Sequence, residues 1–287
     1  MNPAVKAYKP ALGITSLPAE KTIARPFLKW AGGKSQLLAS YEQFFPEAFN
    51  NYFEPFIGGG AVFFHLQPNK ATISDLNPEL TNCYEAIRDD VDSVIRALHK
   101  HTNNYDHYYK VRDLNPNKLT AAQRAARMIF LNRTCFNGLY RVNSSGKFNV
   151  PFGKYKNPRI CDAQNLHATS MLLQQVNVIC ASFEEALKTA KKGDFIYLDP
   201  PYQPVSTTAY FTSYTKGSFR EEDQERLAET FTKLSKRGCL LMLSNSDNEF
   251  IRHLYRNFHQ ETVLANRAIN CKGNRRGPVK ELLVLNY

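Results

Sequence analysis

The chain has 287 residues, of which 43% are hydrophobic and 12% aromatic, and this composition excludes a disordered chain and allows a sizeable apolar core. The 37 lysines and arginines outnumber the 26 aspartates and glutamates, and the net charge of +11 favours a polyanionic partner such as DNA, RNA or anionic lipid. No apolar run reaches the roughly 20 residues of a membrane span and the N-terminus lacks a secretory signal, so we expect a soluble, intracellular protein.

The first quarter of the chain predicts a loose arm and then the start of a βαβ unit. Residues 1–24 contain three prolines and little periodicity, so we expect a flexible N-terminal arm. Apolar residues at helical spacing predict a helix over 35–45, which Ser35 would cap. A strand, a glycine turn, a short helix and a second strand are then expected, at 52–56, 58–60, 61–66 and 71–76.

The middle of the chain has the composition of an inserted domain. Asn77 and Pro78 suit the cap and the first turn of a helix that runs on into this insertion. From 85 to 175 the sequence is rich in Tyr, Asn, Arg and Lys and has no strong pattern of a buried strand. Within it, T-x-x-Q at 120–123 predicts a capped helix, and NSSG at 143–146 predicts a hairpin or a broad loop.

Alternating strand and helix signals resume after the insertion. We expect strands at 176–182, 194–198 and 239–243, helices that begin at 182, 218 and 249, and strand-like tails at 261–269 and 280–287. Gly238 stands where the second of these helices would end. The pattern predicts an α/β fold whose sheet, formed by 25–84 and 176–287, is mostly parallel with an antiparallel edge.

The strongest functional signal is LDPPY at 198–202, directly after a predicted buried strand. Two consecutive prolines fix the backbone and forbid a helix, so this segment is held rigid at the carboxyl edge of the sheet, where open α/β sheets bind ligands. Asp199 and a backbone carbonyl could both accept hydrogen bonds from one planar amino group, with the Tyr202 ring stacked on the same heterocycle. The structural alternative is a proline-rich turn without a ligand.

A second signal is the turn FEPFIGGG, which lies between a predicted strand and a helix. Asp75 ends the next strand and is placed to bind ribose hydroxyls. Because the glycines match G-x-G-x-x-G poorly, the turn suits a nucleoside cofactor without a pyrophosphate, or else it is a tight packing feature.

A competing interpretation is an ATP-binding loop at GGKS, 32–35, paired with a magnesium-binding aspartate at the end of FIYLD, 195–199. The phosphate-binding loop needs a glycine five residues before Gly33, and Leu28 stands there. The sequence therefore argues against a nucleotide triphosphatase.

The order FLKWAGGK, FEPFIGGG, SDLN and DPPY resembles the Dam-type family of DNA adenine-N6 methyltransferases, from residue 26 to residue 287. The segment 133–158 resembles the DNA-recognition segment of that family. The resemblance implies a Rossmann-like class I S-adenosylmethionine-dependent methyltransferase sheet with an inserted, mainly helical DNA-recognition domain at 85–175. It also implies methylation of adenine N6 in duplex DNA, at GATC, by base flipping and direct methyl transfer.

The resemblance assigns roles to residues in the two predicted pockets. The catalytic segment would be Asp199, Pro200, Pro201 and Tyr202. S-adenosylmethionine would be bound by Trp30, Lys34, Glu54, Phe56, Gly58, Asp75 and Asp199. No metal and no covalent intermediate are expected, because the chemistry depends on positioning and electrostatics.

The family resemblance also implies which residues read or open the DNA site: Lys29, Phe136, Asn137, Leu139, Arg141, Asn143, Pro151, Lys154 and Tyr155. Arg141 is suited to a bidentate contact with guanine, and Leu139 with Pro151 to a thymine methyl group. Each single basic residue could instead be a solvated charge or a phosphate contact. Residues 203–214 are expected to close over the flipped base, and 271–277 to bind phosphate or form a solvated hairpin tip.

The remaining expectations are a monomer in the cytoplasm of a bacterium, an archaeon or a phage-infected cell, associated with DNA and not with a membrane. The six cysteines are scattered without zinc spacing and need no role in the chemistry. The alternatives are a cytosine-N4 or RNA amino methyltransferase, and a non-catalytic or ATP-binding nucleic-acid protein.

Overall fold

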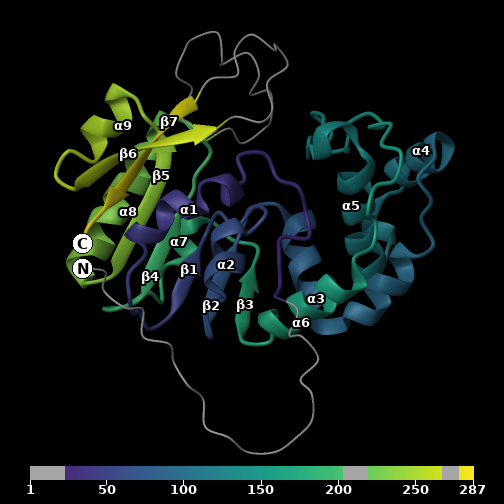
Figure 1. The fold of residues 1–287 in the computed structure, drawn as a ribbon, viewed down its shortest axis with the longest axis horizontal. Coiled ribbons are helices and arrows are strands. Elements are labelled where there is room, and N and C mark those ends of the chain that lie inside the picture. The colour runs from purple at the N-terminus through teal and green to yellow at the C-terminus, as the bar shows by residue number, and fades with distance from the viewer. Residues whose placement is uncertain (1–22, 203–218, 267–277) are drawn as a thin grey trace, which may run out of the picture.

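The fold is a seven-stranded sheet with helices on both faces (Figure 1), in a computed structural model that describes residues 23–202, 219–266 and 278–287. The strand order is β3-β2-β1-β4-β5-β7-β6. The strands are β1 (Tyr52–Glu54), β2 (Ala71–Ser74), β3 (Val176–Ile179), β4 (Phe195–Leu198), β5 (Leu240–Ser246), β6 (His259–Asn266) and β7 (Pro278–Leu285). Strands β1 to β5 pair in parallel and β7 is antiparallel to both of its neighbours, which confirms the predicted Rossmann-like sheet.

The helices follow the capping signals of the sequence. They are α1 (Leu38–Tyr41), α2 (Ala61–Leu66), α3 (Pro78–Leu98), α4 (Tyr105–Asp113), α5 (Ala121–Thr134), α6 (Ala163–Leu173), α7 (Phe183–Ala186), α8 (Glu221–Arg237) and α9 (Glu249–Leu254). The Asn77 side chain accepts from the Glu79 N–H, and Thr120 and Gln123 form the reciprocal capping box. Gly238 ends α8 in the left-handed conformation, as predicted.

Alternate residues of each central strand enter two separate cores, one on each face of the sheet. In β4, Phe195 and Tyr197 face the core shared with α2 and α3, and Ile196 and Leu198 face the core shared with α7, α8 and α9. Both sets are buried, because a central strand of a parallel sheet is covered on both faces.

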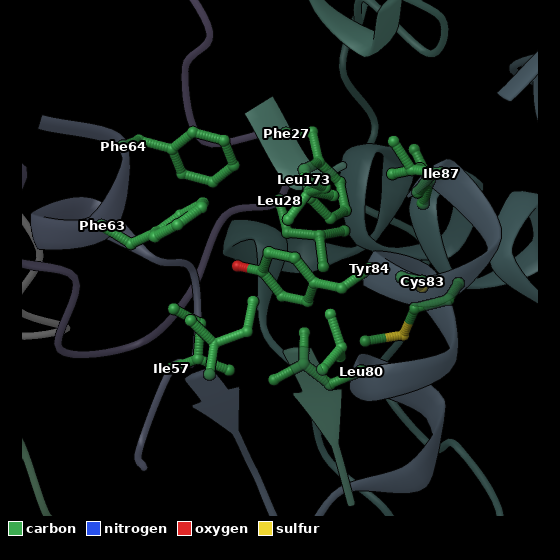
Figure 2. Close-up of a cluster of buried hydrophobic side chains, with 14 of the residues drawn as sticks. Phe27, Leu28, Ile57, Phe63, Phe64, Leu80, Cys83, Tyr84, Ile87 and Leu173 are labelled. Atoms are coloured by element: carbon green, nitrogen blue, oxygen red, sulfur yellow. The ribbon is translucent and has the colours of Figure 1, made fainter. Parts of the chain in front are cut away.

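Tyr84 of α3 stands in the middle of the first core (Figure 2). Its ring lies edge-on to Phe27 and stacks near Phe64, while Leu80 belongs to the same cluster. Its hydroxyl donates to the carbonyl of Gly58 over 3.1 Å. The core therefore fixes the backbone of the glycine turn that follows β1.

The predicted insertion lies beyond the β3 edge, where α3, α5 and α6 pack together and α4 extends away from the sheet (Figure 1). Helix α3 is kinked at Asp90 (φ −152°, ψ 68°), whose carboxylate then accepts from the Ser93 N–H. The helix runs through the predicted boundary at 85, and the division into domains stays a prediction.

Two expectations about helices are wrong. The segment 35–45 is not one helix: it is divided into 3₁₀ turns at Lys34–Gln36 and Glu42–Phe44 around the short α1, and no side chain caps these pieces. The Lys34 side chain is buried, and its ammonium donates to the Gly32 carbonyl, which keeps this stretch in tight turns that the apolar spacing did not reveal. Helix α8 begins after Arg220, later than residue 218. The segments predicted at 203–214 and 271–277 lie outside the described residues.

Candidate active site

The site lies where the topology of the sheet changes direction. Strands β1 and β4 are neighbours, but the chain continues from β1 to β2 on one side and from β4 to β5 on the other. Ligands of open α/β sheets bind at such a switch point, outside the carboxyl ends of the strands. The glycine turn follows β1 and the DPPY segment follows β4, so the topology brings both sequence signals to this edge.

Asp199 is the centre of a polar network at the end of β4. Its Oδ1 lies 2.9 Å from the Lys34 ammonium and accepts a hydrogen bond of 2.9 Å from Ser244 Oγ. Since Ser244 donates to Asp199, the Tyr197 hydroxyl, 2.9 Å away, donates to Ser244. Burial raises the pKa of Asp199, and the Lys34 charge and the Ser244 hydrogen bond oppose that rise. Both contacts use Oδ1, so neither of them occupies Oδ2.

Lys34 is a buried cation that joins three groups of the site. Its side chain is only 4% exposed, and its ammonium donates to the Gly32 carbonyl over 2.7 Å. The same ammonium lies 4.6 Å from the centroid of the Tyr202 ring and 4.0 Å from Glu281 Oε2. The lysine of the GGKS sequence is therefore engaged by Asp199 and its surroundings.

Four polar residues of this network were not identified from the sequence: Tyr41, Tyr197, Ser244 and Glu281. Glu281 accepts hydrogen bonds from the Tyr202 hydroxyl (2.6 Å) and the Tyr41 hydroxyl (3.2 Å). A usable signal existed, because Glu281 and Ser244 are polar residues within the apolar strands ELLVL and LLMLS. A buried polar residue in a strand needs partners, and here the partners belong to the site.

The DPPY backbone is also supported from α8 and β5. The carbonyl of Pro201 accepts from Gln224 Nε2 over 3.0 Å, and the oxygen of Gln224 accepts from Asn245 Nδ2 over 3.0 Å. Gln224 and Asn245 are both fully buried, so this chain of hydrogen bonds fixes the loop at the end of β4.

The glycine turn is bound to the end of β2. Gly58 has a positive φ of 46°, and its N–H donates to Asp75 Oδ2 over 3.3 Å, while Asp75 Oδ1 accepts from the Asn77 N–H over 3.0 Å. Burial raises the pKa of Asp75, and these backbone hydrogen bonds oppose the rise. The next residue, Leu76, is 70% exposed, which leaves an apolar side chain in solvent beside a carboxylate. Leu76 stands in SDLN but was not among the residues predicted to bind the cofactor.

Trp30 packs directly on this turn. A Cβ atom at Gly58 would lie 2.7 Å from Trp30 Cδ1, so only glycine permits the approach. The indole also stacks on Tyr140, with 5.5 Å between ring centroids. Trp30 therefore joins the glycine turn to the inserted segment. Phe56, two residues before Gly58, packs against Phe183 and Phe219 at 5.7 Å each.

Glu54, at the end of β1, points into the protein. Its Oε2 accepts from the Tyr52 hydroxyl over 2.7 Å and from the Phe63 N–H over 3.1 Å. Burial raises the pKa of Glu54 to about 8, with a further contribution from the charge of Asp199, although the two donors act in the opposite direction. The carboxyl group ties β1 to α2, and its assignment to the cofactor pocket stays a prediction.

The residues predicted to contact DNA begin with Lys29, beside Trp30. The side chain of Asn132 accepts from the Lys29 N–H (2.8 Å) and donates to the carbonyls of Lys29 (2.8 Å) and Gly138 (2.9 Å). The Lys29 ammonium lies 4.5 Å from the centroid of the Tyr155 ring. Asn132 thus joins the 28–34 turn to the segment predicted to read DNA.

The remaining predicted DNA contacts lie on or next to two paired stretches, 135–142 and 148–152. Isolated bridges join Cys135 to Phe152 and Val142 to Phe148, which confirms a hairpin-like loop around NSSG. Phe136, Arg141, Asn143, Pro151 and Lys154 are exposed, whereas Asn137, Leu139 and Tyr155 are half-buried. The structure brings these residues onto one segment beside Lys29.

Two of these residues make contacts within the loop itself. Arg141 Nε donates to Asn149 Oδ1 over 2.8 Å, and the Asn143 side chain accepts from the Ser145 and Lys147 N–H groups over 3.0 Å each. Asn143 therefore has a local role in the turn. The Arg141 guanidinium is held against Asn149, which uses part of its donors.

The described residues contain neither a candidate membrane span nor a candidate metal centre. No helix within 23–202, 219–266 and 278–287 is long and apolar enough to cross a membrane. In the same ranges no three His, Cys, Asp or Glu side chains gather as metal ligands.

The chain matches the family of D12 class N6 adenine-specific DNA methyltransferases over residues 30–269. It is 46% identical to the type II methyltransferase M.MjaIII of Methanocaldococcus jannaschii, covering 92% of this chain and 99% of the relative. It is 44% identical to the type II methyltransferase M1.LlaDCHI of Lactococcus lactis subsp. cremoris, covering 94% and 98%. The DNA adenine methylase of Vibrio cholerae is 38% identical, covering 91% and 95%. A solved structure from Thermoplasma acidophilum is 10% identical to this chain. The match covers 89% of this chain and 87% of that one, with a TM-score of 0.37.

Proposed function

Because the chain belongs to the D12 class of N6 adenine-specific DNA methyltransferases, we propose that it methylates adenine at GATC, with S-adenosylmethionine as donor and the target base flipped from the duplex. Adenine-N6 methylation of DNA follows from the family. The proposed part is the identity of the methyl donor, the GATC recognition sequence and the flipping of the target adenine. One observation carries the proposal: the DPPY segment and the glycine turn meet at the switch point of the sheet, with Asp199 between Lys34 and Ser244.

The residues at the glycine turn fit S-adenosylmethionine. Asp75 offers a partly exposed carboxylate to ribose hydroxyls, and the exposed Leu76 offers an apolar face to an adenine ring. Asp199 and Glu281 carry two negative charges against the one positive charge of Lys34, which favours a sulfonium cation nearby. Trp30, Phe56 and Gly58 would complete the pocket. When bound, the cofactor would supply an electrophilic methyl group.

The DPPY residues would position the target amino group. Asp199 Oδ2 and the Pro200 carbonyl would accept hydrogen bonds from its two N–H groups, so that the nitrogen lone pair points at the methyl carbon for an in-line displacement. The new N–C bond would form as the sulfonium C–S bond breaks, which leaves a neutral thioether, and N6 would lose one proton to solvent. The Tyr202 ring would stack on the adenine, while the prolines and the hydrogen bond from Gln224 to Pro201 keep the acceptors in place. Reaching N6 in this geometry requires the base to leave the stack.

The segment 136–155 would read the sequence, and Lys29 would lie between the cofactor turn and the DNA. Arg141 would exchange its contact with Asn149 for guanine O6 and N7, and Leu139 with Pro151 would pack on a thymine methyl group. We place the enzyme in the cytoplasm as a DNA-bound monomer, paired with a restriction nuclease in some hosts, as the type II names of its relatives suggest.

The test compares two duplexes of equal composition, one with a single GATC and the other with GTAC at the same place. With methyl-labelled S-adenosylmethionine, only the first should gain label in N6-methyladenine. Equal label in both duplexes would overturn the GATC specificity, and no label in either would overturn the cofactor. 2-Aminopurine at the target position should brighten on binding if the base is flipped.

Asp199→Asn provides the matched control for this test. It keeps the size of the side chain and should lower kcat by about 100-fold or more, because one fixed acceptor is lost. Arg141→Ala should instead keep turnover and weaken discrimination by about 1–3 kcal/mol at the guanine position.

A further inference from the structure

A largely buried carboxylate on β7 contacts the catalytic segment through Tyr202. Glu281 lies on the antiparallel strand between β5 and β6, paired in register with Ser246 and Val263. Its side chain is 14% exposed, although its strand neighbours Leu282, Leu283 and Val284 are fully buried and apolar. A carboxylate in this position needs several donors to offset the loss of water.

Among the described residues, the polar groups around the Glu281 carboxylate belong to the active site or its support. Tyr202 donates from its hydroxyl over 2.6 Å, Tyr41 over 3.2 Å, and the Lys34 ammonium lies at 4.0 Å, all to the same Oε2 atom. The bond from Tyr202 is short, as expected for a hydroxyl that donates to a carboxylate.

This geometry fixes the orientation of the Tyr202 ring. One end of the residue is held by the rigid backbone of DPPY, and the other end by Glu281, so rotation about the side-chain bonds would break the hydrogen bond. The Lys34 ammonium lies 4.6 Å from the ring centroid and adds a third restraint. A ring that is oriented before the substrate arrives loses less entropy when it stacks on a base.

We propose that Glu281 is a positioning residue of the methyl-transfer reaction, which acts by holding the Tyr202 ring in the orientation that stacks on the target adenine. The inference rests on the proposed role of Tyr202. It does not depend on which DNA sequence is recognised, because β7 and the DPPY segment contact neither Arg141 nor its hairpin in the interactions described above.

The experiment is a double-mutant cycle of Glu281→Gln, which removes the negative charge of the acceptor, and Tyr202→Phe, which removes the donor; both substitutions keep the volume of the side chain. Initial rates are measured with labelled S-adenosylmethionine and bulk DNA that carries no N6-methyladenine. Each single variant should lower kcat by about tenfold and change KM for DNA by less than about threefold, because a charged hydrogen bond is worth roughly this factor. The double variant should be no slower than the slower single variant by more than about twofold.

Two matched variants separate positioning from support of the fold. Tyr41→Phe removes the other hydroxyl from Oε2 and should lower kcat less than Tyr202→Phe does. Glu261→Gln makes the same change on β6, where the side chain is exposed and paired with His259, and should leave kcat unchanged. Multiplicative losses in the cycle, or an equal loss in Tyr41→Phe, would show that Glu281 does not act through Tyr202.

A substrate-free measurement keeps the inference distinct from the proposed function. Thermal denaturation of the same four proteins of the cycle should show coupled Tm shifts, because Tyr202 and Glu281 are in contact. Additive Tm shifts would overturn the inference even if GATC methylation is confirmed. If the Tm shifts are coupled but label appears equally at GATC and GTAC, the proposed role of Glu281 stands and only the proposed GATC specificity is overturned.

Discussion

The Lys34 ammonium lies 2.9 Å from Asp199 Oδ1, so the acid of the DPPY segment is paired with a buried cation from the turn that precedes β1. Burial raises the pKa of Asp199, and Lys34 is the largest influence that opposes this rise. The pairing favours the ionised form of the carboxylate, in which both oxygens of Asp199 act only as hydrogen-bond acceptors.

Lys34→Met should therefore shift the pH dependence of turnover. Without the ammonium, the pKa of Asp199 rises further, so the acidic limb of kcat against pH should move up by about one pH unit or more. Lys34→Arg retains the positive charge and should move the limb less. The measurement is kcat across the pH range for the three proteins. An unchanged limb in Lys34→Met would mean that Asp199 does not depend on this pairing.

Glu54 predicts a pH dependence of stability. Its pKa is raised from 4.5 to about 8, so between these values the folded protein binds a proton that the unfolded chain does not. The free energy of unfolding should fall as the pH rises through this window, and this contribution is lost above the folded pKa. Glu54→Gln should show a flatter dependence in urea unfolding at a series of pH values. An equal slope in both proteins would contradict the raised pKa.

Asn132 predicts a stability effect at the junction of two segments. Its buried side chain makes three hydrogen bonds, to both backbone groups of Lys29 and to the Gly138 carbonyl. Asn132→Ala should lower the free energy of unfolding by about 3 kcal/mol, because it leaves these backbone groups without partners. The exposed Asn157 is the matched control, and Asn157→Ala should change stability by less than about 0.5 kcal/mol.

Substitution of Gly58 should lower the affinity for the cofactor. Gly58→Ala would place a methyl group 2.7 Å from Trp30 Cδ1 and strain a residue whose φ is positive. Gly146 also has a positive φ, but a Cβ there meets nothing within 4 Å, so Gly146→Ala carries the strain alone. Thermal shift by S-adenosylmethionine should be reduced in Gly58→Ala and retained in Gly146→Ala. Equal shifts in both would show that Trp30 and the turn do not shape the cofactor pocket.

The sequence predicted the parallel strands and most helix ends because local chemistry decides them. Asn77 before Pro78, Thr120 before Gln123 and Gly238 after α8 each satisfy backbone groups within a few residues. The segment 35–45 was mispredicted for the opposite reason. Its backbone follows the burial of Lys34 against Asp199, a contact between distant parts of the chain that apolar spacing cannot reveal.

Likewise, only some residues of the candidate site were predicted from the sequence. Asp199 and the glycine turn stand in short motifs whose rigid or permissive backbone is visible in the sequence. Ser244 and Glu281 have no motif around them, and their positions depend on the pairing of β5 with β7. The order of strands in the sheet places them beside DPPY, and that order is a property of the whole fold.

Helix α3 affects how the protein unfolds. It begins beside Asp75, sends Tyr84 to the Gly58 carbonyl, and continues past its kink to pack on α5 and α6. Cutting the chain near residue 85 would sever one hydrogen-bonded helix and strip the glycine turn of its hydroxyl donor. We therefore expect the glycine turn and the bundle beyond the β3 edge to unfold as a single cooperative unit, and a fragment that contains only one of them to have an incomplete core.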